Sequence, residues 1–258
     1  MFRLAVFLAV AAVAYGRSTL LHREFIHRIV GGSPADIEEY PFAVTLQRNN
    51  FQYCAGAILN EEWVVTAAHC TDAVPSGFQV VSGVTNKYDS SATKTSATVV
   101  QHPDYNDNTL ENDISLLRLA TPLTLGATQD AIPTATDEDV EYGDLIVVGW
   151  GTTSESGSDS LNLLQVTVPF VDDDTCNDLN NNGVYASMLC AGEAGKDACQ
   201  VRRTRKRGTL VNEAGSSFEH VGIVSWGYGC ARPGRPGVYT ETAFFNDWIN
   251  SQMARARA

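Results

Sequence analysis

The stretch Trp63-Val64-Val65-Thr66-Ala67-Ala68-His69-Cys70 places a histidine and a cysteine directly after a short β-branched run. Valine and threonine are typical of strands. An imidazole that titrates near neutral pH suits a general base, and a disulfide at Cys70 would pin the backbone beside it. A lone histidine is usually structural, so the meaning of His69 depends on the rest of the chain.

Short apolar runs of the same kind recur along the chain and are broken by Gly, Asn, Asp and Pro. Their spacing predicts an all-β sandwich or barrel, and neither βαβ alternation nor a fixed repeat appears. The C-terminal end differs, because Phe245, Trp248, Ile249 and Met253 lie on one face of a helix predicted from Glu241 to about Ala254. The predicted strands include Phe42–Leu46, Trp63–Thr66, Phe78–Val81, Ile114–Leu117, Leu145–Val148, Leu164–Val168 and Val221–Val224.

The composition limits the class of protein. The 258 residues carry a net charge of −12, which argues against nucleic acid as the main partner. Six cysteines predict three disulfides, although six allow 15 pairings. No Cys-x-x-Cys pair with zinc spacing appears, so neither a metal site nor a cofactor is predicted.

The N-terminal residues read as targeting and processing segments. A short apolar run ending in Ala12-Val13-Ala14 predicts a signal peptide over residues 1–14. The run is too short to span a bilayer, so we expect a secreted, extracellular protein that is not held in a membrane. A basic segment, residues 15–28, ends at Arg28 before Ile29-Val30-Gly31-Gly32, which is typical of a processing site.

A carboxylate stands at the entry to another predicted strand, in Asn112-Asp113-Ile114-Ser115-Leu116-Leu117. Such an aspartate can orient a histidine through the second ring nitrogen. An ordinary turn aspartate is the alternative. Asp113 therefore gains weight only if other fragments point to the same chemistry.

Together these fragments resemble the trypsin-like branch of the chymotrypsin-type serine proteases, from Ile29 to the C-terminus. The resemblance implies two six-stranded antiparallel β-barrels, all-β, with a C-terminal helix and an active site between the barrels, in a domain over residues 29–258. The fragments that carry it, in the family's order, are Ile29-Val30-Gly31-Gly32, Trp63 to Cys70, Asn112-Asp113-Ile114, Gly149-Trp150-Gly151, Met188 to Gly192, Lys196 to Gln200, Val224 to Gly227 and Pro236 to Thr240.

The resemblance also implies roles for single residues. His69 would be the general base and Asp113 its orienting carboxylate. Asp197 would be the acid at the bottom of the primary specificity pocket, with Gly227 and Gly237 as walls that admit a long Arg or Lys. The implied substrate-binding strand is Ser225-Trp226-Gly227, and the implied disulfides are Cys54–Cys70, Cys176–Cys190 and Cys199–Cys230.

Activation in this family needs a cleavage that here would follow Arg28. The freed Ile29 ammonium would then pair with an aspartate one residue before the catalytic serine. The resemblance thus implies a monomer. Its implied partners are an activating protease, protein or peptide substrates, and inhibitors. Related enzymes bind calcium through carboxylates at the ends of a loop, and the matching segment Gly83–Thr95 has Val84 and Ser or Ala at those positions, so calcium is not predicted.

The chain departs from the family where the nucleophile should be. After Cys199-Gln200 the family has Gly-Asp-Ser-Gly-Gly-Pro, whereas this chain has Val201-Arg202-Arg203-Thr204-Arg205-Lys206. Counted from Cys199, Arg203 stands at the position of the serine and Arg202 at that of the aspartate. Thr204 is one position late, and Ser216 and Ser217 lie in a hairpin turn without the required context. Loss of the serine in a comparable protease lowers turnover about a millionfold.

The charge reversal also affects folding. If Arg202 were buried against the Ile29 ammonium, two unpaired cations would each cost several kcal/mol, out of a total stability of about 5–15 kcal/mol. We therefore expect Val201–Gly208 to stay in solvent and the pocket to remain zymogen-like.

The basic run has several readings. It can be an exposed loop, a site for trypsin-like cleavage, or a patch for heparin or nucleic acid, which the acidic remainder disfavours. It can also result from a frameshift that returns to frame near Thr209 or from a misplaced splice boundary after Gln200. The nucleotides AGC-GGA-GGA-CC encode Ser-Gly-Gly and the start of Pro, and shifted by two bases they contain CGG-AGG-ACC, which encodes Arg202-Arg203-Thr204. Two hypotheses result: a secreted endopeptidase cutting after Arg or Lys whose recorded nucleophile motif is corrupt, or a non-catalytic homologue that binds proteins.

Overall fold

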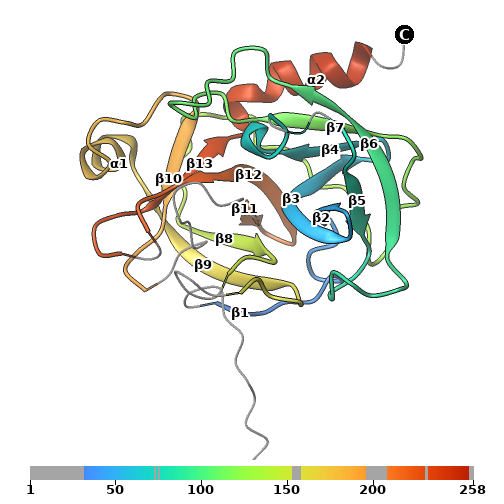
Figure 1. Cartoon of the computed structure of the whole chain (residues 1–258). Helices are drawn as coiled ribbons and strands as arrows, with labels where there is room; N and C mark the ends of the chain where they lie inside the picture. The colour runs from blue at the N-terminus through green and yellow to red at the C-terminus, as the bar shows by residue number, and fades with distance from the viewer. Residues whose placement is uncertain are drawn as a thin grey trace, which may run out of the picture.

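The strands form two closed antiparallel barrels in the computed structural model, which describes residues 32–72, 74, 76–152, 158–195, 208–229 and 232–255 (Figure 1). The first barrel has the strand order β2-β3-β4-β7-β6-β5. The second has the order β8-β9-β10-β13-β12-β11 and closes because β8 pairs with both β9 and β11. The predicted all-β fold with two six-stranded barrels is confirmed.

The strands have the following bounds. They are β1 (Ser33–Pro34), β2 (Ala43–Arg48), β3 (Phe51–Asn60), β4 (Trp63–Thr66), β5 (Gln79–Ser82), β6 (Thr93–Gln101), β7 (Ser115–Leu119), β8 (Asp144–Gly149), β9 (Leu164–Val171), β10 (Met188–Ala191), β11 (Gly208–Ala214), β12 (Ser217–Trp226) and β13 (Gly237–Glu241). The short β1 pairs with β9 at the outside of the second barrel.

The stretch Trp63–Thr66, which precedes His69, forms β4 of the first barrel. All four residues of β4 are buried, and β4 pairs with β3 on one side and with β7 on the other. Its valines belong to one large apolar core that also contains Val211, Ile223 and Ile249 from the C-terminal half. The core of the first barrel therefore continues into the contact with the second.

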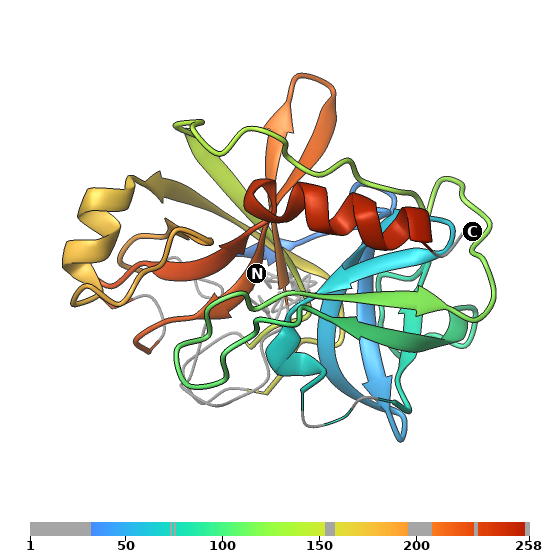
Figure 2. The same ribbon diagram turned by 90° about the horizontal axis from the view of Figure 1, so that it is seen from above.

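The C-terminal helix α2 (Asn246–Arg255) leaves the second barrel and packs on the first. Ile249 is fully buried, Trp248 and Met253 pack against the first core, and Asn60 Nδ2 donates a hydrogen bond to Met253 Sδ (3.3 Å). Figure 2 shows α2 lying along the strands of the first barrel. The predicted start of this helix was wrong, because Glu241 is the last residue of β13.

Two 3₁₀ turns and a second helix complete the described elements. They are η1 (Ala68–Cys70), η2 (Ala243–Phe245) and α1 (Asp173–Leu179). The Asp172 side chain caps α1 by accepting a hydrogen bond from Thr175 N (2.9 Å). Within the part of the chain that the structure describes, no helix is both long enough and apolar enough to cross a membrane.

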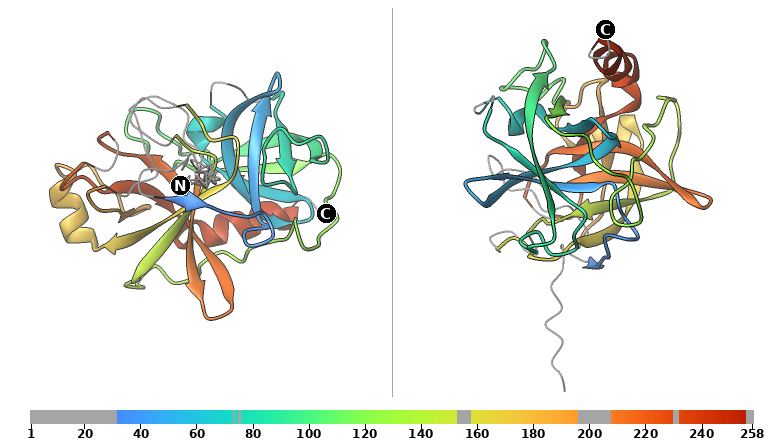
Figure 3. Two further views of the ribbon diagram at one scale, coloured as in Figure 1. Left: turned by 90° about the horizontal axis from the view of Figure 1, so that it is seen from below. Right: turned by 90° about the vertical axis from the view of Figure 1, so that its right-hand side faces the viewer.

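The β11–β12 hairpin projects from the second barrel (Figure 3). Its tip includes Ser216 and Ser217, which were predicted to lie at a hairpin turn, and both residues are exposed. Gly208 corrects one expectation: it is the first residue of β11, is buried and pairs with Gly149 of β8, so it does not lie in solvent. An added Cβ at Gly208 would lie 3.1 Å from the Val148 carbonyl oxygen, which is closer than ordinary van der Waals contact. A larger residue at this position would therefore crowd β8.

Candidate active site

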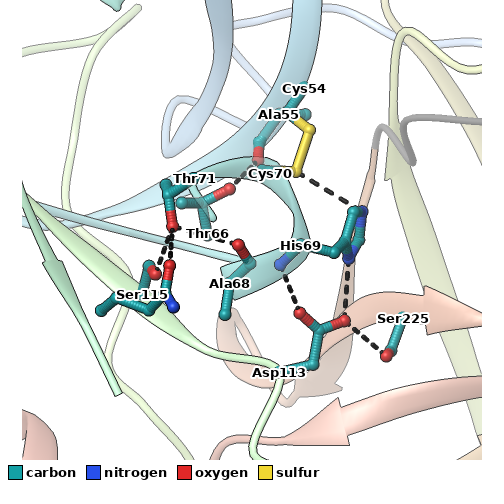
Figure 4. The surroundings of a disulfide bond; sticks show 11 residues. Cys54, Ala55, Thr66, Ala68, His69, Cys70, Thr71, Asp113, Ser115 and Ser225 are labelled. Carbon is teal, nitrogen blue, oxygen red and sulfur yellow. Dashed lines mark hydrogen bonds and ion pairs between the residues drawn. A yellow bond between two sulfur atoms is a disulfide. The ribbon is translucent and has the colours of Figure 1, made fainter. Parts of the chain in front are cut away.

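His69 lies in the short η1 turn directly after β4 and is tied down on one side by a disulfide. Cys54 of β3 is bonded to Cys70 of η1 (Figure 4). The His69 side chain is 15% exposed to solvent, so the ring lies at the edge of the core and can be reached from outside. β4, η1 and the disulfide thus present an accessible imidazole from a rigid base.

Asp113 meets His69 at two atoms. Asp113 Oδ1 accepts a hydrogen bond from His69 N (2.8 Å), and Asp113 Oδ2 lies 2.8 Å from His69 Nδ1. The carboxylate is fully buried. A carboxylate that binds both the backbone and the ring fixes the ring orientation and favours the tautomer with its proton on Nδ1.

The second barrel supplies two further contacts to Asp113. Ser225 of β12 donates from Oγ to Asp113 Oδ2 (2.6 Å), and Thr240 of β13 donates from Oγ1 to the Asp113 carbonyl oxygen (2.9 Å). Both hydroxyls are buried. The His69–Asp113 pair therefore lies at the seam where the two barrels meet.

Electrostatics keep the Asp113 carboxyl ionised in spite of its burial. Burial by itself raises its pKa, but the charge interaction with His69 and the hydrogen bonds from His69 and Ser225 together hold the pKa below its ordinary value. With the Nδ1–H of His69 directed at Asp113 Oδ2, Nε2 is the ring nitrogen that is left to accept a proton.

Among the described residues, His69 Nε2 contacts the sulfur atom of Cys70. Cys70 Sγ lies 3.5 Å from Nε2, and no hydroxyl oxygen of the described residues lies within hydrogen-bonding distance of it. Segment 201–206, with Arg203 and Thr204, lies outside the described residues. The predicted tip serines, Ser216 and Ser217, belong to the exposed hairpin of Figure 3.

The predicted substrate-binding residues fall on two paired strands. Trp226 at the end of β12 pairs with Val238 of β13 in an antiparallel ladder. Gly227, the next residue, therefore comes opposite Gly237, the first residue of β13. Both glycines are buried, and Trp226 is partly exposed with Tyr228 packed edge-on at 5.8 Å. Asp197 lies outside the described residues, as do Arg28 and Ile29.

The cysteines match two of the three implied pairings. Cys54 is bonded to Cys70 and Cys176 to Cys190. Cys199 and Cys230 lie outside the described residues. Each bonded pair ties adjacent parts of one barrel together, the first beside His69 and the second between α1 and β10.

One cluster has ligand atoms close enough for a metal ion among the residues described, and its chemistry does not fit one. Cys54, His69 and Cys70 place these atoms within 4.8 Å of one another. The sulfur atoms of Cys54 and Cys70 are bonded to each other in the disulfide, whereas a metal ion is bound by cysteine thiolates. In the segment from Gly83 to Thr95, Lys87 is 2% exposed and its Nζ donates to Gln52 Oε1 (2.5 Å).

Comparison with known proteins agrees with this geometry. The Trypsin family profile matches residues 29–249. The chain is 40% identical over 237 residues to trypsin-1 of Astacus astacus, covering 86% of this chain and 99% of the relative. It is 34% identical over 265 residues to trypsin of Phaedon cochleariae, covering 98% and 99%. The fold and the site define a chymotrypsin-type serine protease, and the chain belongs to its trypsin family.

Proposed function

We propose that this protein is built as a secreted, trypsin-like endopeptidase that hydrolyses peptide bonds after Arg or Lys, with digestion as its role. The observation that carries the proposal is the His69–Asp113 pair, held at two atoms and buttressed by Ser225. In this proposal His69 is the general base and Asp113 orients it. Asp197 would select the basic side chain of the substrate, and Gly227 and Gly237 would leave room for that side chain.

The proposed order of segments follows from the same function. A signal peptide occupies residues 1–14 and an activation peptide residues 15–28, and the protease domain spans residues 29–258. Two disulfides suit an oxidising, extracellular compartment. Cleavage after Arg28 by another protease would free Ile29, and the domain would act as a monomer on protein substrates and bind protein inhibitors.

We further infer that the chain as written does not turn over substrate. Arg203 occupies the place of the attacking serine, and a guanidinium is no nucleophile at neutral pH because it stays protonated. Arg202 replaces the aspartate that would receive the Ile29 ammonium, so two cations would meet there. A shifted reading frame over residues 201–208 explains a loss confined to one motif, since His69, Asp113 and Asp197 are all retained.

A second function is supported by the literal sequence. If Val201–Lys206 is genuine, the protein is a non-catalytic protease homologue that binds proteins through the retained substrate face. Sequencing the transcript across Gln200–Val211 separates the two: Ser-Gly-Gly codons in frame support the enzyme, and Arg codons without a shifted motif support the binding protein.

The biochemical test compares two chains. Both are cleaved after Arg28, and hydrolysis of an Arg-amide peptide is measured. The chain as written should show no turnover. The chain with Val201→Gly, Arg202→Asp, Arg203→Ser, Thr204→Gly, Arg205→Gly and Lys206→Pro should cleave it, by a margin of about a millionfold. Turnover by the chain as written would refute the inactivity.

A further inference from the structure

The two segments that carry His69 and Asp113 meet a second time, two residues further along each. Thr71 follows His69 and Ser115 follows Asp113 by two positions. The Thr71 and Ser115 hydroxyl oxygens lie 2.7 Å apart, and the two residues are 1% and 0% exposed. Figure 4 shows this contact on the opposite side of η1 from the His69–Asp113 contact. Segments 69–71 and 113–115 are therefore joined at two points.

The Thr71 hydroxyl also has two acceptors beside it. Thr71 Oγ1 also lies 3.1 Å from the Ala68 carbonyl oxygen and 3.0 Å from Gln101 Oε1. Both are acceptors, and a hydroxyl has one proton to donate. Thr71 can therefore donate to only one of its neighbouring oxygens, and either Thr71 or Ser115 can be the donor in the contact between the two hydroxyls. Gln101 belongs to β6 and pairs with Ser115 of β7, so the network anchors η1 to two strands.

The η1 turn has few other hydrogen bonds to hold it. It is three residues long, and no side chain caps its first residue. Its backbone hydrogen bonds are Cys70 N to Ala67 O (3.2 Å), Thr71 N to Ala68 O (2.8 Å) and Asp72 N to Ala68 O (2.9 Å). The Cys54–Cys70 disulfide fixes one end of the turn, whereas the Thr71–Ser115 contact fixes its rotation relative to β7. Rotation of η1 would move His69 Nδ1 away from Asp113 Oδ2.

We propose that Thr71 and Ser115 are a positioning pair that keeps the His69 imidazole aligned on Asp113. The proposal deepens the proposed function, because it assigns two further residues to the same site. Neither hydroxyl touches substrate; both act through the backbone of η1. The pair is part of the machinery that holds His69 and not only of the barrel core.

The test uses the proton on His69 Nδ1 rather than peptide cleavage. In the full chain at constant neutral pH, the low-field proton resonance of the imidazole is recorded by NMR and assigned by its loss in His69→Gln. Its exchange rate with water reports how often the Nδ1–Oδ2 bond opens. Thr71→Val and Ser115→Ala should each move the resonance upfield and speed exchange about tenfold, because each removes a buried hydrogen bond.

Two comparisons separate positioning from general stability. Thr71→Ser keeps the hydroxyl and should restore the resonance and the slow exchange. Thr242→Val is the matched control: Thr242 is equally buried and donates from Oγ1 to the His220 carbonyl oxygen (2.7 Å) in the second barrel. It should lower the free energy of unfolding without moving the His69 proton.

The opposite result would overturn the proposal. If Thr71→Val and Ser115→Ala lose stability as Thr242→Val does, yet leave the resonance and its exchange rate unchanged, the pair is structural only. Should Thr71→Val fail to fold, Ser115→Ala carries the same test with the loss of one oxygen atom. Because the readout needs no catalysis, it is independent of whether a chain restored at residues 201–206 cleaves peptides.

Discussion

Ser225 Oγ lies 2.6 Å from Asp113 Oδ2, which joins the second barrel to the buried carboxylate of the first. Thr240 adds a bond to the Asp113 carbonyl oxygen from the neighbouring strand. Asp113 is thus held by both barrels, while His69 is held by the first alone. The docking of the barrels and the alignment of the site are one structural feature.

Ser225→Ala should raise the pKa of Asp113 toward its ordinary value, because it removes one of the hydrogen bonds that lower it. A carboxyl with a lowered pKa stabilises the fold above its unfolded-state pKa, and this stability is lost as pH falls through the folded-state pKa. The variant should lose about 2 kcal/mol in urea unfolding at pH 7, and the difference should shrink in acid.

Ser187→Ala is the control for Ser225→Ala. Ser187 Oγ is also buried and makes no hydrogen bond to any described residue, so its removal should leave stability within about 0.5 kcal/mol of the parent. Equal losses in the two variants would contradict the assigned role of the Ser225 hydroxyl.

The two disulfides form a matched pair of experiments. They close loops of similar sequence separation, 16 and 14, so Cys54→Ala/Cys70→Ala and Cys176→Ala/Cys190→Ala should each lower stability by about 3 kcal/mol. Only the first pair flanks His69, so only its loss should broaden or shift the His69 Nδ1 proton resonance. An equal effect of both pairs on this resonance would argue against local control by Cys70.

His220 predicts a loss of stability in mild acid. It is fully buried, with Thr209 Oγ1 2.5 Å from Nε2, and desolvation lowers its pKa from 6.5 to about 3. Between these values the unfolded chain binds a proton that the folded chain does not, so stability falls as pH is lowered, by at most about 1.4 kcal/mol per pH unit. His220→Gln should flatten the dependence between pH 6.5 and 4; an unchanged slope would count against this account.

Glu241 predicts the opposite dependence toward alkaline pH. Burial, followed by repulsion from Asp173, Glu138 and Asp139, raises its pKa from 4.5 to about 8. Between these values the folded chain keeps a proton that the unfolded chain has released, so stability falls as pH rises and levels off above 8. Glu241→Gln should therefore gain stability relative to the parent between pH 5 and 8.5.

The exposed Glu213 provides the control for Glu241. Glu213→Gln at the β11–β12 hairpin should follow the parent at both pH values within about 0.5 kcal/mol. A parallel pH dependence of Glu241→Gln and the parent would show that the buried carboxyl does not release a proton in this range.

Much of the fold could be predicted from local pattern. All seven apolar runs lie largely within strands, and Trp63–Thr66 is β4 residue for residue. β6 was missed because Thr93–Gln101 is polar and only partly buried. The α1 helix was missed although Asp172 and the acidic residues after it are an N-terminal helix signal. Glu241 was placed in a helix because apolar spacing cannot show where β13 ends.

The site was predictable as far as the family motifs reach. His69 and Asp113 were named from those motifs, and the structure brings them together. Thr240 and the Thr71–Ser115 pair were not, because each depends on contacts between residues 44 or more positions apart, and a hydroxyl has no sequence signal for its partner. Asp197 and Arg203 stay predictions.

We infer that the chain keeps a protease scaffold but lacks the oxygen atom that would attack the peptide bond. The most direct measurement is the intact mass of the chain, cleaved after Arg28, after incubation with an arginine-derived phosphonate that reacts only with an activated serine or threonine hydroxyl. The account predicts no added mass for the chain as written and one adduct for the chain restored at residues 201–206. An adduct on the chain as written would contradict it.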